Sequence, residues 1–152
     1  MYVIIGTIAM KYISIILYCL VITNTTFGQS QPSPDKKMKI LVHITQGPED
    51  PTRAALAFLV AKSAIDEGHS VVLFLAGDGV NLFRSDVMEN LTGLGTGKLK
   101  EHYEAIVKGG GKFYLSGMSS KARGFDPEGA AEAATPNRLV ELALEHDRVL
   151  TY

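Results

Sequence analysis

Residues 39–45 read KILVHIT and residues 70–76 read SVVLFLA, and these two short apolar runs decide the fold class. Neither run alternates between apolar and polar side chains, which is typical of strands buried on both faces of a sheet. Between them, Asp50 and Pro51 predict a helix start, with a capping carboxylate and a proline at the first helical position. The helix is predicted to continue to residue 66 or 67. A buried strand, a helix and a second buried strand predict a parallel βαβ unit.

The same alternation continues to the end of the chain. Residues 80–97 predict irregular structure with a helical turn near 82–85 and a flexible glycine-rich connection over 93–97, and 117–124 predict a loop with a short helical turn. The expected elements are helices over 98–108 and 137–145, strands over 112–116 and 148–152, and a weak strand over 130–135. The last strand could be an edge or an inner strand. The sequence therefore predicts a three-layer α/β/α domain with a mainly parallel sheet of four or five strands.

The first 28 residues differ in kind from the rest. Lys11 precedes an apolar segment over 12–22, and a polar end carries small residues at Thr26 and Gly28. This is the pattern of a signal peptide, with cleavage expected after Gly28. We therefore expect a periplasmic or secreted protein. The alternative is an uncleaved membrane anchor, for which Lys11 would be costly in the middle of the bilayer.

Residues 29–37 (QSQPSPDKK) predict a polar tether before a domain over 38–152. The chain has 152 residues, a formal net charge of −1 and no basic arm, so nucleic acid is not an expected partner. A single cysteine, Cys19, lies in the predicted leader. Cleavage would leave a domain without any thiol of its own. The four histidines are scattered, so no metal site or other cofactor is expected, and His43 is predicted to be a hydrogen-bonded core residue.

A site is expected where the parallel strands end, because ligands of open α/β sheets bind outside the carboxyl ends of the strands. The three loops there cover 45–50, 77–81 and 116–123 and are rich in glycine and small polar residues. Tight turns are the alternative explanation for each glycine. Lys121 and Arg123 could hold an anion, although they could equally be solvated charges. The ligand-binding candidates are Gly47, Asp78, Gly79, Ser116, Gly117, Ser119, Lys121 and Arg123.

Two other kinds of site are not supported. The segment GLGTGK over 93–98 follows no predicted strand, and a phosphate-binding P-loop would need Gly at Thr92 and Ser or Thr at Leu99. The chain also has no G-x-S-x-G nucleophile elbow, and Ser116 and Ser119 have no evident His–Asp partners, so a serine hydrolase is not expected.

Residues 38–152 resemble the DsrE/YchN-like (DsrE/DsrF-like) family of small sulfur-relay proteins. The resemblance rests on QGP over 46–48, DGV over 78–80, GMSSKARG over 117–124 and RVLTY over 148–152. It implies a homotrimer or homohexamer. It also implies a cysteine at the end of the third strand in members that transfer sulfur, and in some a second one three residues later. This chain has Ser116 and Ser119 there, and a persulfide must be carried on sulfur.

Three functions follow from these patterns. The first is an exported, non-catalytic DsrE-like module that binds a small anionic ligand or a protein partner at Ser116. The second is an accessory subunit of a sulfur-relay or redox complex whose reactive thiol comes from a partner. The third, an independent enzyme using Asp78, Ser116 or Lys121, has no support from residue spacing.

Overall fold

The computed structural model describes residues 36–127 and 129–152. The predicted signal peptide over 1–28 and the tether up to residue 35 lie outside the described residues. Within the described part of the chain, no helix is both long and apolar enough to cross a membrane.

The βαβ unit expected from the two apolar runs is present. Strand β1 (Lys39–Ile44) is followed by helix α2 (Pro51–Asp66) and strand β2 (Ser70–Leu75). Asp50 caps α2 as expected, because its side chain accepts a hydrogen bond from the Arg53 backbone N–H at 3.0 Å. Beyond β2 the helical elements are η2 (Gly77–Phe83), α3 (Ser85–Asn90), α4 (Leu99–Lys108), α5 (Gly117–Ala122) and α6 (Pro136–Glu145), and the strands are β3 (Thr92–Gly93), β4 (Gly97–Lys98), β5 (Lys112–Ser116), β6 (Ala131–Ala134) and β7 (Arg148–Thr151).

Five parallel strands form the main sheet in the order β6-β5-β2-β1-β7. The weak strand expected over 130–135 is therefore present as β6, and the last strand lies at the edge beside β1. Because all five strands run in the same direction, their carboxyl ends meet at one edge of the sheet. The loops after β1, β2 and β5 follow three neighbouring strands and so lie side by side.

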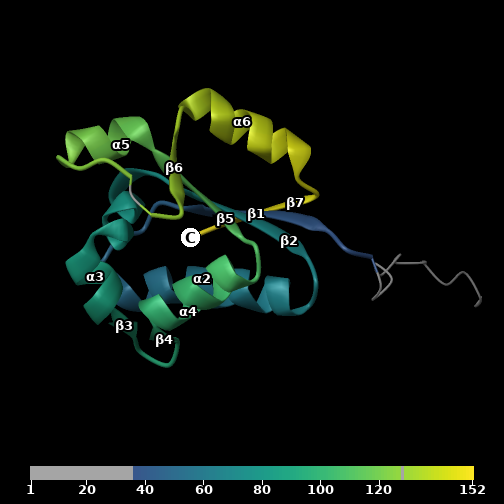
Figure 1. Ribbon diagram of the computed structural model, residues 1–152, viewed down its shortest axis with the longest axis horizontal. Helices are drawn as coiled ribbons and strands as arrows, with labels where there is room; N and C mark the ends of the chain where they lie inside the picture. The colour runs from purple at the N-terminus through teal and green to yellow at the C-terminus, as the bar shows by residue number, and fades with distance from the viewer. Residues whose placement is uncertain (1–35, 128) are drawn as a thin grey trace, which may run out of the picture. The chain divides into compact units, whose positions relative to one another are not determined.

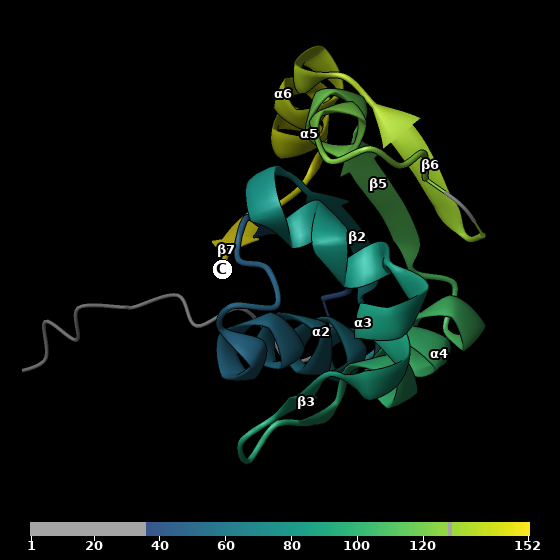
Figure 2. The same ribbon diagram turned by 90° about the vertical axis from the view of Figure 1, so that its left-hand side faces the viewer.

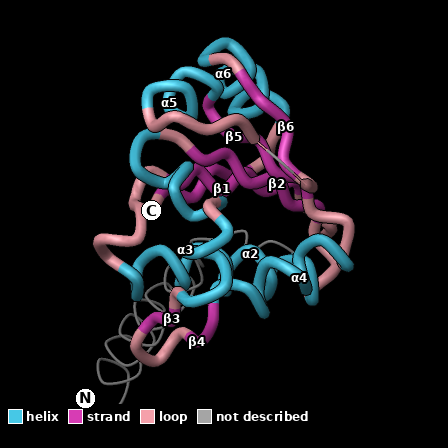
Figure 3. Tube along the Cα trace, turned by 60° about the vertical axis from the view of Figure 1, so that its left-hand side comes forward, coloured by secondary structure: helices cyan, strands magenta, loops and turns pink. Residues whose placement is uncertain are grey.

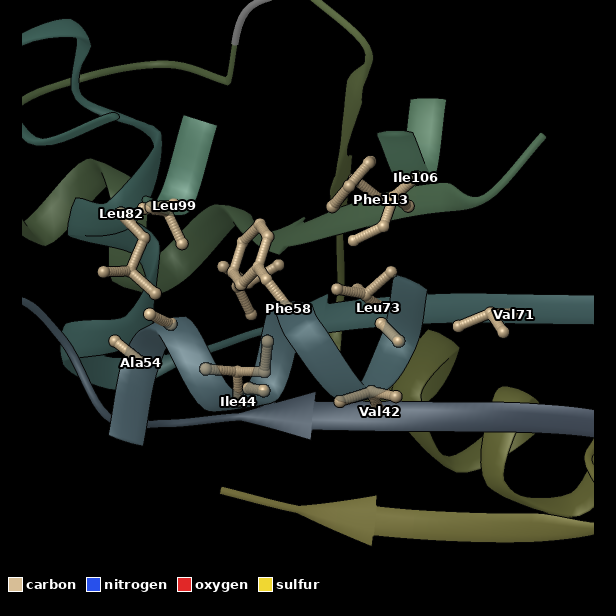
Figure 4. Close-up of a cluster of buried hydrophobic side chains, with 14 of the residues drawn as sticks. Val42, Ile44, Ala54, Phe58, Val71, Leu73, Leu82, Leu99, Ile106 and Phe113 are labelled. Atoms are coloured by element: carbon tan, nitrogen blue, oxygen red, sulfur yellow. The ribbon is translucent and has the colours of Figure 1, made fainter. Parts of the chain in front are cut away.

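Helices cover both faces of this sheet. Figure 1 shows α2 and α4 below the sheet and α5 and α6 above it, and Figure 2 shows the same layers after a quarter turn. The larger core fills the α2 and α4 side, where Phe58 stacks on Phe113 with ring centroids 6.0 Å apart (Figure 4). A smaller cluster on the α6 side contains Leu41, Val72, Phe74, Ala134 and Leu142. The expected three-layer α/β/α domain is confirmed.

The segment over 80–97 is more ordered than the sequence predicts. It holds the end of the 3₁₀ helix η2, the helix α3 and a small antiparallel hairpin of β3 and β4, visible in Figure 3. The glycines that suggested a flexible connection instead make the turn, because Gly95 and Gly97 adopt φ values of +74° and +85°. Thr96 N–H closes the turn on Gly93 O at 3.3 Å. Glycine content alone did not separate a tight turn from a flexible loop.

Candidate functional site

The loops after β1 and β2 pack closely against each other at two glycines. A Cβ atom on Gly47 would lie 2.6 Å from Asp78 O, and one on Gly79 would lie 2.6 Å from Ile44 O. Real Cβ atoms do not approach oxygen so closely, so each position requires the absence of a side chain. Gly79 N–H also donates to Thr45 O at 3.1 Å. Both candidates therefore have a packing role in the described structure, and their role in ligand binding stays a prediction.

Ser116 and Ser119 tie α5 to the loop after β2. Ser116 is the last residue of β5 and the N-cap of α5, and its Oγ accepts from Ser119 N–H at 3.3 Å. Ser119 Oγ in turn accepts from Gly77 N–H at 3.0 Å. Ser116 is 8% exposed. Both hydroxyls thus accept hydrogen bonds from backbone N–H groups, and Ser116 exposes little surface to a ligand.

Arg123 forms an ion pair with Asp78 across the same two loops. Its Nη2 lies 2.6 Å and its Nε 3.2 Å from Asp78 Oδ1, and its Nη1 donates to Ser119 O at 3.2 Å. Arg123 was predicted to hold an anion or to be a solvated charge. In the described structure its charge is paired with Asp78, and its role in ligand binding stays a prediction.

Lys121 is the candidate whose charge remains available. It is exposed and forms no ion pair with any described residue. It lines a shallow hollow of about 400 Å³ together with Gly124, Phe125 and Asp126. Beside it on α5, Met118 is 70% exposed. The surface that a ligand or partner could contact is therefore the outer side of α5 and the loop that follows, called here the α5 surface (Met118, Lys121 and 124–126).

Sequence reasoning missed the residues that support this surface. Arg84 Nη2 donates to Arg123 O at 2.5 Å, and its guanidinium lies 4.9 Å from the centre of the Phe125 ring. Arg84 and Phe125 are 41 positions apart in the chain. Arg84 also belongs to the segment expected to be irregular, so no local pattern could pair it with the α5 loop.

His43 differs from its prediction. It is half-buried, and its Nε2 atom is buried without a hydrogen-bond partner. Among the described residues, the expectation of a hydrogen-bonded core histidine is therefore wrong for this atom, and the ring packs edge-on against the apolar Phe74, with centroids 6.1 Å apart. Burial lowers the pKa of His43 below its ordinary value, since the charged form loses hydration.

Among the described residues, Ser116 Oγ bonds to the Ser119 N–H and to no side-chain base. His43 is on β1 and Ser116 on β5, with β2 between them and an offset of two residues in register, so their backbones are about 12 Å apart and the histidine cannot act as a base for this serine. Among the described residues, no group of three or more His, Cys, Asp and Glu side chains could hold a metal ion.

Comparison with known proteins agrees with this geometry. The sequence profile of the DsrE/DsrF-like family matches residues 38–152. The chain belongs to the DsrE/DsrF-like family. The match covers the whole described domain from Met38 to the last residue, Tyr152, so the family resemblance read from the sequence motifs is confirmed.

A solved member of similar fold is the YchN protein from E. coli. It superposes with a TM-score of 0.63 and 19% sequence identity, over 77% of this chain and 100% of the YchN chain. At this identity the likeness shows the DsrE-like fold alone. No curated protein sequence matches the chain significantly.

Proposed function

We propose that this protein is an exported, non-catalytic DsrE-like module that binds an anionic ligand, or an anionic group of a protein partner, at the α5 surface. The family is linked to sulfur relay. One observation carries the proposal: both serine hydroxyls accept hydrogen bonds from backbone N–H groups. These serines stand at the positions where the family resemblance implies cysteine.

This geometry argues against a reacting serine. A hydroxyl becomes a nucleophile when a neighbouring base takes its proton, and no such base bonds to Ser116 Oγ or Ser119 Oγ in the described structure. A hydroxyl also cannot carry a persulfide, because that intermediate needs a sulfur atom and a thiolate nucleophile. What the two serines do is hold α5 at the end of β2.

Lys121 is the charge of the same region that is available to an anion. Asp78 and Arg123 neutralise each other, whereas Lys121 has no acidic partner among the described residues. The exposed thioether of Met118 lies on the same short helix, and Asp126 lines the hollow together with Lys121, so the α5 surface combines one positive charge, one negative charge and an adaptable apolar group. A carboxylate or phosphate could bind Lys121 on the side of Met118, away from Asp126.

Export is the second part of the proposal, and its support is the signal-peptide pattern over 1–28. Removal of that segment takes away Cys19, so the exported protein depends on a partner for any thiol chemistry. The third part is self-association as a trimer or hexamer. It is supported by Val140 and Leu144, two apolar side chains on the outer face of α6 that are 60% and 83% exposed.

Native mass spectrometry of the protein from the envelope of its own cells tests the proposal. We expect a chain beginning at Gln29, as a closed oligomer, carrying a small molecule or a partner chain. The double variant Met118→Ala, Lys121→Ala should lose that bound mass. The matched control is Leu94→Ala, Lys98→Ala, which removes the same kinds of exposed side chain from the β3–β4 hairpin.

The outcomes are distinct. A bound mass that survives in the α5 double variant would show that binding occurs elsewhere and would overturn the proposed site. A bound partner that carries a reactive cysteine would identify the protein as an accessory subunit of a thiol-using complex. A chain that keeps residues 1–28 would overturn cleavage.

A further inference from the structure

A cavity lies at the opposite edge of the sheet from the α5 surface. It has a volume of about 190 Å³, is half open to solvent and is bordered by the amino ends of β1, β2 and β5 and the carboxyl end of α6. In Figure 1 this is the end where α6 turns into β7, beside the start of β1. Its floor includes Val72 and Leu142, two buried residues of the smaller apolar cluster. We call it the amino-edge cavity.

Two lysines reach this cavity from strands on either side of β2. Lys39 of β1 is in register with Ser70, and Lys112 of β5 is in register with Val72, so both lie on the face that α6 covers. Strands in a sheet are about 4.8 Å apart and the two positions are offset by two residues in register, which places the two lysine backbones about 12 Å apart. Long flexible lysine side chains can span this separation and converge on one ligand.

Arg138 is the other cation of the cavity wall, and it faces two carboxylates, of which Glu145 also lines the cavity. Arg138 Nη1 donates to Glu141 at 3.0 Å and to Glu145 at 3.3 Å. Hydrogen bonding to Glu141, and then to Tyr114, raises the pKa of Arg138 above its ordinary value. The guanidinium also lies 5.5 Å from the centre of the Tyr114 ring, which fixes one wall of the cavity. The charge of Arg138 is thus already matched.

The lysines, by contrast, form no ion pair with the described residues. Asp147 bonds to the Lys39 backbone N–H at 2.8 Å and is not part of the cavity wall. The carboxyl end of α6 adds about half a negative charge, which is smaller than the two positive charges of the lysines. The cavity therefore has positive charge at its rim and an apolar floor.

We infer that the amino-edge cavity binds a small organic dianion with a short apolar body, held by Lys39 and Lys112. The negative groups of the ligand meet the lysines, and its methylene groups cover Val72 and Leu142. This inference is independent of the α5 surface, which lies at the other edge of the sheet.

Titration of the ¹⁵N-labelled full chain with succinate, at constant ionic strength, tests it. We expect saturable shifts of the backbone amide signals of Ser70, Val72 and Lys112. Sulfate, a dianion without methylene groups, should bind several-fold more weakly, because each buried methylene contributes about a fourfold gain in affinity. Lys39→Met and Lys112→Met should each weaken succinate binding at least fivefold.

Two further variants keep the outcome clear. Glu145→Gln removes the carboxylate from the cavity wall and should tighten succinate binding, a gain that misfolding cannot produce. Lys121→Met removes a lysine at the α5 surface and should leave succinate binding unchanged. Shifts that do not saturate, equal weakening by Lys121→Met, or weaker binding to Glu145→Gln would each overturn the inference. None of these results bears on the α5 surface, so the two proposals fail separately.

Discussion

Arg123 Nη2 lies 2.6 Å from Asp78 Oδ1, which joins the loop after β5 to the loop after β2. The two side chains are 26% and 59% exposed, so water screens much of their attraction. The pair matters more for position than for stability, because it fixes the end of α5 on which the α5 surface depends. The structure around it leads to five predictions.

The ion pair itself should contribute little to folding. In a double-mutant cycle with Asp78→Asn and Arg123→Gln, we expect a coupling free energy of at most about 1 kcal/mol, as is usual for exposed pairs. Urea unfolding of the four proteins measures it, and 1 M NaCl should reduce it. A coupling of several kcal/mol would show that the pair is more shielded from water than its exposure implies.

Gly79 and Gly117 should respond oppositely to alanine. Gly79→Ala should lower the free energy of unfolding by about 1–3 kcal/mol, because the new Cβ would lie 2.6 Å from the backbone oxygen of Ile44. Gly117→Ala meets nothing closer than Ala134 O at 3.7 Å and should be neutral or stabilising. Thermal unfolding of both variants decides this. Equal losses would contradict the close approach of β1 and the η2 loop.

Ser119 and Ser120 are neighbours on α5 with opposite hydrogen-bond status. Ser119→Ala should cost about 1 kcal/mol, because it leaves Gly77 N–H without its acceptor. Ser120 is 1% exposed and its Oγ has no partner, so Ser120→Ala should be neutral or stabilise by up to about 1 kcal/mol. Both variants replace serine by alanine in the same helix, so the change in helix propensity is the same in both. The difference between their free energies of unfolding, measured by chemical unfolding, therefore reports the hydrogen bond. A loss of stability in Ser120→Ala would indicate a bound water or ligand at that hydroxyl.

The buried His43 should make stability fall in mild acid. Its folded pKa is lowered by burial, whereas the unfolded chain keeps the ordinary value of about 6.5. Between those two values the unfolded state binds more protons, so the free energy of unfolding decreases as the pH falls below about 6.5. The contribution is at most about 1.4 kcal/mol per pH unit.

Comparison of wild type with His43→Leu from pH 8 to 5 tests this linkage. As the pH falls, the free energy of unfolding should decrease more for the wild type than for the variant. The other titrating groups are the same in both proteins, so their contributions cancel in the difference. A difference that stays constant with pH would mean that His43 keeps its ordinary pKa.

Self-association should depend on the outer face of α6. Leu144→Glu places a charge on an apolar side chain that is 83% exposed and should lower the mass measured by analytical ultracentrifugation. Leu94→Glu is the matched control, because Leu94 is 89% exposed on the β3–β4 hairpin. An unchanged mass for Leu144→Glu, or an equal decrease for both variants, would exclude α6 as the contact between copies.

The sequence by itself determined the elements whose signals are local. Two uninterrupted apolar runs fixed β1 and β2 as buried strands, and Asp50 with Pro51 fixed the start of α2. The four-residue β6 falls within the weak strand expected over 130–135. Apolar periodicity and helix capping act within a few residues, so they can be read along the chain without knowing what packs across from it.

Only the tertiary structure decided which candidate residues are available. The sequence placed four candidates at one edge of the sheet: Asp78, Ser119, Lys121 and Arg123. It could not show that Arg123 forms an ion pair with Asp78, or that Ser119 Oγ accepts a hydrogen bond from Gly77 N–H. It also could not show that Lys121 stays exposed. The reason is distance along the chain, since Arg123 and Asp78 are 45 positions apart. The same holds for the amino-edge cavity, which Lys39 and Lys112 both line because their strands flank β2. Contacts of this kind depend on strand order and register, which local sequence patterns do not encode.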